Sequence, residues 1–494
     1  MIFSVVSCTD AEKPSESDAS GDGTYDVQET ELDESEKTQV SATESATDVN
    51  ADVDESEKAD KTEGFTTEMQ TEEDSFVSLY DGVFQTGYDR VAITPSVPVG
   101  DFIRVENDIY ATCLAVYDGN KTIIVVSIEV EALMEGACDD IREEISSAAK
   151  VPEDNIFITV THNHSAPSFG SFSGTAITRI ARSAKRAVND LSDTKMFIGT
   201  GKTTGMAFVR RYVDANGNYA SVNPLAPDGA ALDGDTTRCV SEADDTVQVV
   251  RFVREGKKDI IATNWQAHHA HAIDAKPAMI SSDVMHYIRE DIEAGDDDAL
   301  VIYLAGASGN INFRAPNLEA RKYKDYVSIA HAFAEVVLEV SREENLTRIQ
   351  TGKINIEKTT FSATHEKDTE EEIAAANRRI RSGSGTSGDR YLVSRNRSNS
   401  SKLRIAAVSF GDLAFITAPY EMFDNNGVQI KTGSPFEMTV IITNSDGAYA
   451  YMPSYEACTI YGGYETEATY FATGVAEELV AKYVEMLEEL NEKS

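Results

Sequence analysis

The stretch "IFITVTHNHSAPSFG" (residues 156–170) joins a run of five apolar or β-branched residues to a polar segment that carries two histidines. The run predicts a buried strand that ends near residue 160. Side chains alternate between the two faces of a strand, so His162 and His164 are expected on the same face. The stretch therefore predicts paired imidazoles at the end of a buried strand.

A second histidine cluster, "NWQAHHAH" (264–271), also follows an apolar run, and the two clusters hold five of the eight histidines. His269 and His271 are expected on one strand face and His268 on the other. A lone histidine is more often an ordinary core or surface residue, but two strand ends can aim imidazoles at one point. Zinc binds neutral imidazoles together with carboxylate or phenolate oxygens, and a catalytic zinc keeps one position for water.

Apolar runs alternate with amphipathic segments from about residue 80, which predicts an α/β (mixed α+β) fold with mixed β-sheets covered by helices. Strands are predicted at 122–130, 156–160, 246–253, 259–265, 299–306, 404–410, 413–419 and 438–444, and helices at 138–149, 174–191, 283–294, 318–342, 367–382 and 474–491. Several strands are apolar on both faces, as expected when helices cover a sheet on two sides. "FGDL" (410–413) predicts a hairpin, and 382–402 an exposed loop.

The chain of 494 residues has a formal net charge of -40, of which -19 falls in residues 10–74 and -21 in the rest. Nucleic-acid binding depends on clustered Lys and Arg, so a nucleic-acid partner is not expected. Residues 9–78 are rich in Ser, Thr, Glu and Asp and are predicted to be a disordered linker. A single domain is predicted over 79–494.

The five cysteines are scattered without a CxxC pair, which favours neither a zinc ribbon nor a disulfide framework. Cys8 ends the short apolar stretch "MIFSVVSC", which is similar to the end of a bacterial lipoprotein signal although it has no basic segment. We therefore expect a lipid anchor at Cys8 as the only membrane contact, and a location outside the bacterial membrane, anchored or secreted. The alternatives are a true start upstream of Met1 or a Cys8 of no significance.

Six segments occur in an order that resembles the N-terminal catalytic domain of the neutral/alkaline non-lysosomal ceramidase family, over about residues 83–491. They are "GYDRVAITP" (87–95), "THNHSAPSFG" (161–170), "NWQAHHAH" (264–271), "GASGNINF" (306–313), "APYEMF" (418–423) and "GAYAYMPSYEACTIYGGYE" (447–465). The resemblance implies a zinc-dependent amidase whose metal is held by two His, a Glu and a Tyr.

Residue by residue, the resemblance implies that His162, His269 and Glu421 bind zinc. It implies Tyr449 as the fourth ligand and places His164 beside the substrate. Zinc-activated water would attack the amide, and a nearby imidazole could pass the proton to the leaving amine.

The resemblance also implies two groups that stabilise the developing oxyanion. Arg210 matches the family's site arginine, with Val209 where the family has Asn. Tyr464 matches a second active-site tyrosine, although the spacing also allows Tyr461.

This sequence departs from the family at Asn312, which stands where the family has a serine assigned to the amide, and at Asn310, which replaces an Asp. An amide side chain is no nucleophile, so Asn312 is expected only to orient substrate. The β-sandwich domain that follows in full-length ceramidases is also not expected here. These departures weigh against ceramide as the substrate, whereas metal-dependent hydrolysis stays the expectation.

Three functions follow. The first is a zinc hydrolase of a linear amide in a small-molecule or lipid substrate. The second is hydrolysis of an ester or glycan-derived substrate at the same metal, and the third is a binding lipoprotein without turnover. Asp283 is predicted to cap a helix rather than to serve the site. The metal ligands could be oriented by hydrogen bonds from His268, His271 and His286.

Overall fold

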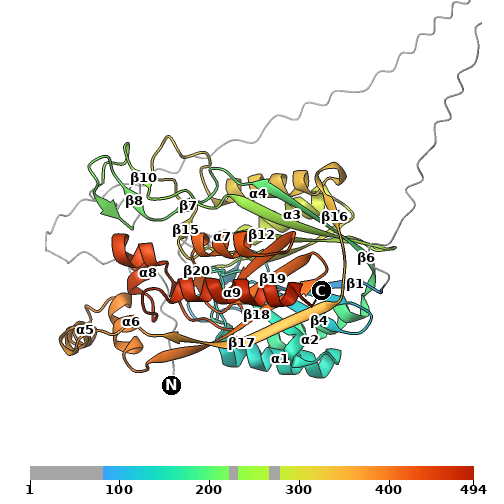
Figure 1. The fold of residues 1–494 in the computed structure, drawn as a ribbon, viewed down its shortest axis with the longest axis horizontal. Helices are drawn as coiled ribbons and strands as arrows, with labels where there is room; N and C mark the ends of the chain where they lie inside the picture. Colours follow the sequence, from blue (N-terminus) through green and yellow to red (C-terminus); the bar gives the residue numbers. More distant parts are fainter. Residues whose placement is uncertain (1–81, 222–231, 266–278, 494) are drawn as a thin grey trace, which may run out of the picture. The chain divides into compact units, whose positions relative to one another are not determined.

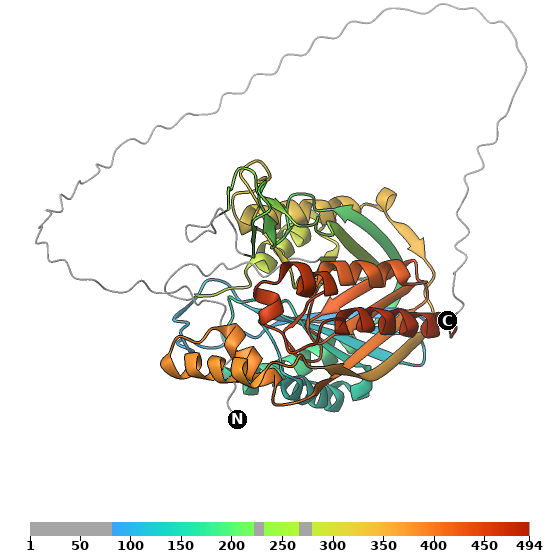
Figure 2. The same ribbon diagram turned by 60° about the vertical axis from the view of Figure 1, so that its left-hand side comes forward.

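Two β-sheets packed face to face form the centre of the molecule, and helices cover the outer side of each sheet (Figures 1 and 2). The computed structural model describes residues 82–221, 232–265 and 279–493. These residues belong to one unit that begins at Ser78. The predicted signal (1–8), the acidic linker (9–78) and the histidines of the second cluster lie outside the described residues.

The larger sheet has the order β14-β12-β11-β6-β1-β3-β4-β5, and β16 pairs with β6. The β4–β5 and β12–β14 pairs are parallel and the other pairs are antiparallel. Its strands are β1 (Gln85–Ala92), β3 (Tyr110–Tyr117), β4 (Thr122–Ile128), β5 (Ile156–Val160), β6 (Ser192–Lys202), β11 (Thr246–Arg254), β12 (Asp259–Trp265), β14 (Ala299–Ala305) and β16 (Thr347–Ile349).

The smaller sheet has the order β17-β18-β19-β21 and is also mixed, because β19 and β21 are parallel. Its strands are β17 (Ile354–Thr364), β18 (Ser400–Phe410), β19 (Leu413–Ala418) and β21 (Met438–Thr443). Phe410 pairs with Leu413, which confirms the predicted hairpin. Short strand pairs complete the structure: β2 (Arg104–Val105) with β13 (Met279–Ile280), β7 (Phe208–Val209) with β15 (Ile311–Asn312), β20 (Glu421–Met422) with β22 (Tyr451–Met452), and β8 (Tyr212–Val213) with β9 (Tyr219–Ala220) and β10 (Arg238–Cys239).

Helices α1, α2, α3 and α4 cover the larger sheet, and α7 and α9 cover the smaller one. The α-helices are α1 (Glu135–Ala149), α2 (Ser173–Asn189), α3 (Val284–Gly295), α4 (Tyr326–Val340), α5 (Glu370–Ser382), α6 (Ser387–Arg395), α7 (Asp424–Gly433), α8 (Tyr464–Glu467) and α9 (Val475–Asn491). No helix among the described residues has the length and apolarity needed to cross a bilayer.

Strand β18 shows how the layers are built. Ala406 and Val408 pack with the inner face of the larger sheet, whereas Ile405 and Ala407 pack on the side of α9. This alternation explains why the strands are apolar on both faces. The mixed α/β prediction is confirmed, but the expectation that helices cover both faces of a sheet is wrong, because one face of each sheet packs on the other sheet.

Two predicted segments differ from the structure. The exposed loop predicted at 382–402 contains α6, which Thr386 begins with a reciprocal capping box to Asp389. The helix predicted from residue 318 begins only at Tyr326, where Asp325 forms a capping box with Ser328. In both cases the cap sets the start of the helix.

The carboxyl ends of β5, β12, β14 and β21 meet at one side of the molecule. Thr159 in β5 forms a bridge to Ser445, just after β21. The side-chain amide of Asn264 donates to the carbonyls of Leu304 and Ile441, at 2.9 and 2.8 Å. The ends of these strands are therefore gathered into one region, as is common for sites in α/β proteins.

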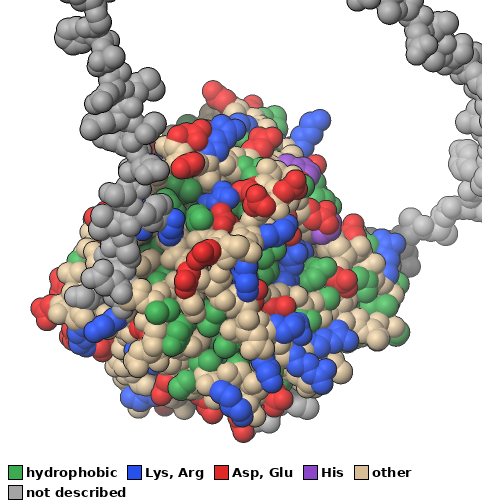
Figure 3. All heavy atoms as spheres, turned by 90° about the vertical axis from the view of Figure 1, so that its right-hand side faces the viewer, with side chains coloured by type: hydrophobic (Ala, Val, Ile, Leu, Met, Phe, Trp, Pro, Cys, Tyr) green, Lys and Arg blue, Asp and Glu red, His purple; other side chains and the backbone are tan. Residues whose placement is uncertain are grey.

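Acidic and basic side chains are interspersed on the face shown in Figure 3, with hydrophobic side chains between them. A mixed surface of this kind is ordinary for a soluble domain. The absence of a nucleic-acid partner stays a prediction.

Candidate active site

The first histidine segment continues the line of β5 beside β4. The amides of Thr161 and Asn163 donate to the carbonyls of Ile128 and Val130, both at 3.0 Å. Between them, His162 has a φ of +58°, a conformation uncommon for a residue with a side chain. The Asn163 side chain holds the segment, because it donates to the Ser281 carbonyl at 2.7 Å. The histidine is therefore fixed in a strained backbone position, a feature concentrated at functional sites.

His162 and His164 lie side by side, with ring centroids 4.8 Å apart and planes at 90°. Their Nε2 atoms are 3.4 Å apart. His162 Nε2 also lies 3.4 Å from Oε2 of Glu421, which starts β20. The structure therefore brings together three of the predicted site residues: His162, His164 and Glu421.

Glu131 lies on the other side of the two imidazoles. Its carbonyl oxygen is 2.7 Å from Nδ1 of His162, and its carboxylate is 3.6 Å from Nδ1 of His164. Burial disfavours a charge on His162, but the carboxylates of Glu421 and Glu131 raise its pKa above the ordinary value. Burial also raises the pKa of Glu131. Two carboxylates around two imidazoles make a place that favours a positive charge.

Tyr451 lies beside Glu421 because β20 and β22 pair in parallel with these two residues in register. Its ring lies 5.4 Å from the guanidinium carbon of Arg210. Tyr464 packs edge-on against Tyr451 at 5.6 Å, and Arg210 lies 5.9 Å from the Tyr464 ring. Arg210 and Tyr464 are thus brought together, next to Glu421.

Glu465 anchors the arginine. Its buried carboxylate accepts from Nε of Arg210 and, at 2.8 Å, from Nη2 of Arg211. Arg210 also donates to the carbonyl of Gly309 at 3.0 Å. Burial lowers the pKa of Arg210, but Tyr451 and Glu465 raise it well above the ordinary value. Arg210 is therefore a fixed cation, bound on one side and facing aromatic rings on the other.

Tyr449, which the resemblance implied as a ligand, and Tyr461, which the spacing allowed, both lie apart from the contacts of Arg210. The Tyr449 hydroxyl donates to the carbonyl of Lys402 at 3.3 Å, and burial, together with Glu135, raises its pKa to about 12. Among the described contacts, it is Tyr451 and not Tyr449 that joins Glu421 and Arg210. Tyr461, the alternative to Tyr464, stacks on Tyr219 instead.

Asn310 and Asn312 are both engaged with neighbours. Asn310 donates to the Asp424 carboxylate at 2.6 Å and accepts from the Asp424 amide at 2.9 Å. An acid at 310 would face this buried carboxylate, which explains why an amide fits. Asn312 contacts the Tyr212 hydroxyl at 3.3 Å and accepts from the amide of Arg314 at 2.8 Å. The structure does not bring Asn312 into contact with His162 or Glu421.

Asp283 caps α3, as predicted, by accepting from the amide of Val284 at 2.8 Å. It also accepts from the Ser165 hydroxyl at 2.8 Å and so ties the histidine segment to this helix. His286 lies 3.4 Å from Glu290, one turn along α3, rather than with the site histidines.

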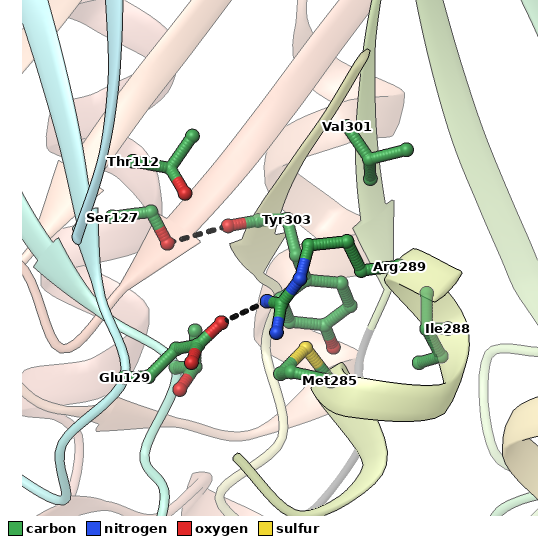
Figure 4. A pocket seen from close by; sticks show the side chains of 9 residues that line it. Thr112, Ser127, Glu129, Met285, Ile288, Arg289, Val301 and Tyr303 are labelled. Carbon is green, nitrogen blue, oxygen red and sulfur yellow. Dashed lines mark hydrogen bonds and ion pairs between the residues drawn. The ribbon is translucent and has the colours of Figure 1, made fainter. Parts of the chain in front are cut away.

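Glu129 lies two residues before Glu131 but belongs to a different cluster. Its carboxylate pairs with Arg289 of α3 and accepts from the Ser282 hydroxyl and, at 2.8 Å, from the amide of Tyr110. Figure 4 shows the carboxylate directed at the guanidinium, beside a cavity of about 20 Å³ between β4, β14 and α3. This pair is almost completely buried.

Sequence reasoning did not identify Glu131, Tyr451 or Glu465. Tyr451 and Glu465 each lie within two residues of a residue that the resemblance singled out, so a motif alone does not separate them. Glu131 follows the apolar run at 122–130, the same strand-end signal that identified His162.

One pair of donor atoms in the site has the spacing of two zinc ligands. Two ligand atoms of a tetrahedral zinc, each about 2.0–2.1 Å from the metal, lie about 3.3 Å apart, and His162 Nε2 and Glu421 Oε2 are 3.4 Å apart. No group of three His, Cys, Asp or Glu side chains in the described part of the chain could hold a metal. The predicted ligand His269 lies outside that part, and the remaining donor is a phenol.

No protein-family model and no curated protein sequence matches the chain. Solved structures do. The crystal structure of neutral ceramidase from Pseudomonas aeruginosa matches with a TM-score of 0.63 and 15% identity, over 84% of this chain and 75% of that one. A ceramidase complexed with C2 matches with a TM-score of 0.61 and 14% identity, over 84% and 76% of the two chains. At such identities the likeness concerns the fold, and the chain has the fold of the neutral ceramidases.

Proposed function

We propose that the chain is a zinc-dependent hydrolase that cleaves a linear amide bond of the N-acyl type. The observation that carries the proposal is the convergence of His162 and Glu421 with the fixed cation Arg210 at the strand ends. The fold shared with two ceramidases supports the same reaction class. An imidazole and a carboxylate can bind a metal, and an arginine can stabilise an oxyanion, so these groups suit metal-assisted attack on a carbonyl.

The residues that would hold the metal are His162, Glu421 and Tyr451, with His269 as the fourth. Tyr451 replaces Tyr449 in this proposal, because it is the tyrosine in register with Glu421. When bound, zinc supplies Lewis-acid chemistry, in that it polarises a carbonyl and makes water a better nucleophile at neutral pH.

The remaining groups have separate tasks. His164 Nε2 lies 3.4 Å from His162 Nε2, within reach of a group that occupies the site, and can take up a proton and return it to the leaving amine. Arg210, held by Glu465, and Tyr464 can donate to an oxyanion without moving during the reaction. Asn312 would act on the substrate only indirectly, because its amide is bound to Tyr212.

We also propose that the protein acts outside the bacterial membrane, where a lipid on Cys8 would tether it. The acidic composition of residues 9–78 supports a spacer between such an anchor and the hydrolase domain. Mass spectrometry of the membrane fraction tests this part, because a lipidated Cys8 peptide is expected and an unmodified Cys8 in all fractions would contradict it.

The experiment for the reaction is a metal analysis combined with a substrate panel. The full chain is expected to contain about one zinc per molecule and to cleave N-acyl amides, and a chelator is expected to remove both properties. Glu144→Gln, on the exposed side of α1, is the matched control for His162→Ala and Glu421→Gln. Cleavage of esters or glycan-derived substrates alone would favour the second function, and binding without any cleavage the third.

A further inference from the structure

Gly309 and Asn310 form a buried segment whose backbone contacts both the arginine and the carboxylate strand of the site. On one side, the Arg210 amide donates to the Asn310 carbonyl at 2.8 Å, and the Arg210 side chain donates to the Gly309 carbonyl at 3.0 Å. On the other side, the Gly309 amide donates at 2.8 Å to the carbonyl of Met422, the residue after Glu421. The segment therefore connects two site groups that come from different parts of the chain.

Gly309 lies closer to the backbone of Glu421 than a residue with a side chain allows. A Cβ atom at position 309 would lie 2.7 Å from the Glu421 carbonyl oxygen and 3.0 Å from that of Met422. Carbon and oxygen atoms in contact are ordinarily about 3.3–3.6 Å apart, and both of these oxygens belong to the backbone. The glycine therefore lets the Glu421 strand lie directly against the segment that contacts Arg210.

The Asn310 side chain fixes this segment to the start of α7. It donates to the Asp424 carboxylate at 2.6 Å and accepts from the Asp424 amide at 2.9 Å. The other carboxylate oxygen of Asp424 accepts from the Asp244 amide at 3.2 Å. Asn310 and Asp424 are both buried, and a buried polar group is costly to leave unpaired. The position of residues 309–310 is therefore coupled to a helix that begins three residues after Glu421.

Other contacts also act on Arg210 and Glu421. Glu465 binds the guanidinium, and the parallel pairing with Tyr451 sets the register of Glu421. The Tyr451 ring lies 5.4 Å from the guanidinium carbon of Arg210. These contacts of Arg210 are made by side chains, whereas Gly309 contacts the Glu421 strand through its backbone. The distance between the two strands is therefore expected to depend mainly on residues 309–310.

We propose that Gly309, fixed by the Asn310–Asp424 pair, is a positioning residue that sets the distance between Arg210 and Glu421. The tasks given to Arg210 and Glu421, an oxyanion donor and a metal ligand, rest on the proposed function, whereas their separation can be measured without it. Both groups would act on one carbonyl of the substrate, so a misplacement of about 1 Å is expected to lower the rate about 10²-fold.

Gly309→Ala tests the backbone contact, and Gly352→Ala is its matched control. A Cβ atom at position 352 would lie 2.8 Å from the amide nitrogen of Gly411, at the end of β19 opposite to Glu421. Both substitutions therefore force two backbones apart, and both are expected to lower the midpoint of urea unfolding.

Only Gly309→Ala is expected to affect the site. We expect it to lower kcat about 10²-fold and zinc affinity about 10-fold, whereas Gly352→Ala should leave both within about 3-fold of the unaltered chain. Steady-state rates on the best substrate of the panel and competition with a chelator give the two values. Equal losses in the two variants would overturn the proposal.

The Asn310–Asp424 pair is tested by exchanging its side chains. Asn310→Asp places two carboxylates against each other in a buried position, and we expect kcat and zinc affinity to fall about 10- to 100-fold. Adding Asp424→Asn restores one amide opposite one carboxylate, and the amide at 424 can still accept from Asp244. The double variant is therefore expected to return to within about 3-fold of the unaltered chain. A double variant as impaired as Asn310→Asp would contradict the role of the pair.

Crystal structures of the metal-free variants measure the separation directly, without any activity. In Gly309→Ala the backbone of Glu421 is expected to lie about 0.6 Å or more farther from residue 309 and from Arg210. The same displacement is expected in Asn310→Asp, and its reversal in the double variant. An unchanged separation in Gly309→Ala would overturn the proposal, and if that variant does not fold, the exchange at 310 and 424 decides. If the unaltered chain neither binds zinc nor cleaves a substrate, the proposed function fails, and the crystal structures still decide the role of Gly309.

Discussion

Two carboxylates two residues apart, Glu129 and Glu131, occupy opposite situations at the end of β4. Glu129 is buried, neutralised by Arg289 and bonded to Ser282, so its charge is fully used within the protein. Glu131 is partly exposed and faces imidazoles. Two residues close in sequence can therefore have different roles, and the partner of each carboxylate shows whether it stabilises the fold or belongs to the site.

The largest difference between Glu129 and Glu131 is expected in their contributions to stability. Glu129→Ala would leave Arg289 buried and unpaired, and we expect it to lower the free energy of unfolding by about 3–5 kcal/mol. Glu131→Ala removes no such partner and is expected to cost less than about 1 kcal/mol. Urea unfolding at pH 7.5 measures both values. Equal losses would show that Glu131 also serves the core.

Arg210 and Arg289 are expected to differ in the same way, here in their effect on kcat. Arg210→Lys removes a planar donor from the site, and we expect kcat to fall about 10²- to 10³-fold, as for other oxyanion donors. Arg289→Lys is expected to lower stability and to leave kcat within about 3-fold, since Arg289 contacts Glu129 and not the site. Steady-state rates on the best substrate of the panel compare them. Similar losses of kcat in Arg210→Lys and Arg289→Lys would show that the two arginines do not differ in this way.

Tyr449 and Tyr451 form a second pair two residues apart. Tyr451→Phe removes a proposed ligand, and we expect it to weaken zinc binding at least as much as the loss of an outer-shell partner, about 10- to 100-fold. Tyr449→Phe is expected to change zinc binding less than about 3-fold, because the Tyr449 hydroxyl contacts Lys402. Competition with a chromogenic chelator gives the two affinities. A larger effect from Tyr449→Phe would return the ligand role to Tyr449, as the resemblance implied.

The smallest effect is expected at Asn312. Its amide is occupied by Tyr212 and the backbone of Arg314, so Asn312→Ala should lower kcat less than about 3-fold, or less than about 1 kcal/mol in the barrier. The assay is the one used for Arg210→Lys. A loss as large as that of His162→Ala would instead place Asn312 against the substrate.

Much of the fold could be predicted from the sequence because buried strands appear as continuous apolar runs. The predicted bounds of β5 and β12 agree with the structure. β17 was missed because its side chains are largely half-buried or exposed and give no apolar run. Likewise, α6 depends on Thr386 and on the pairing of Asp389 with Arg379, which are contacts rather than periodicity.

The candidate site could be predicted only in part. His162 and His164 carry a local signal, a polar pair after an apolar run. The choice between Tyr449 and Tyr451 depends on Ala450, whose φ of +63° turns the backbone between them, and an alanine gives no sign of that conformation. Glu465 is joined to Arg210 across more than 250 positions, so no local pattern reports the pair.

The most direct test of the central claim is anomalous diffraction at the zinc edge from crystals of the full chain grown with zinc. We predict one strong peak within bonding distance of His162 Nε2 and of the Glu421 carboxylate, absent from crystals of His162→Ala. A well-ordered His162 and Glu421 with no peak between them, or a peak at another place only, would contradict it.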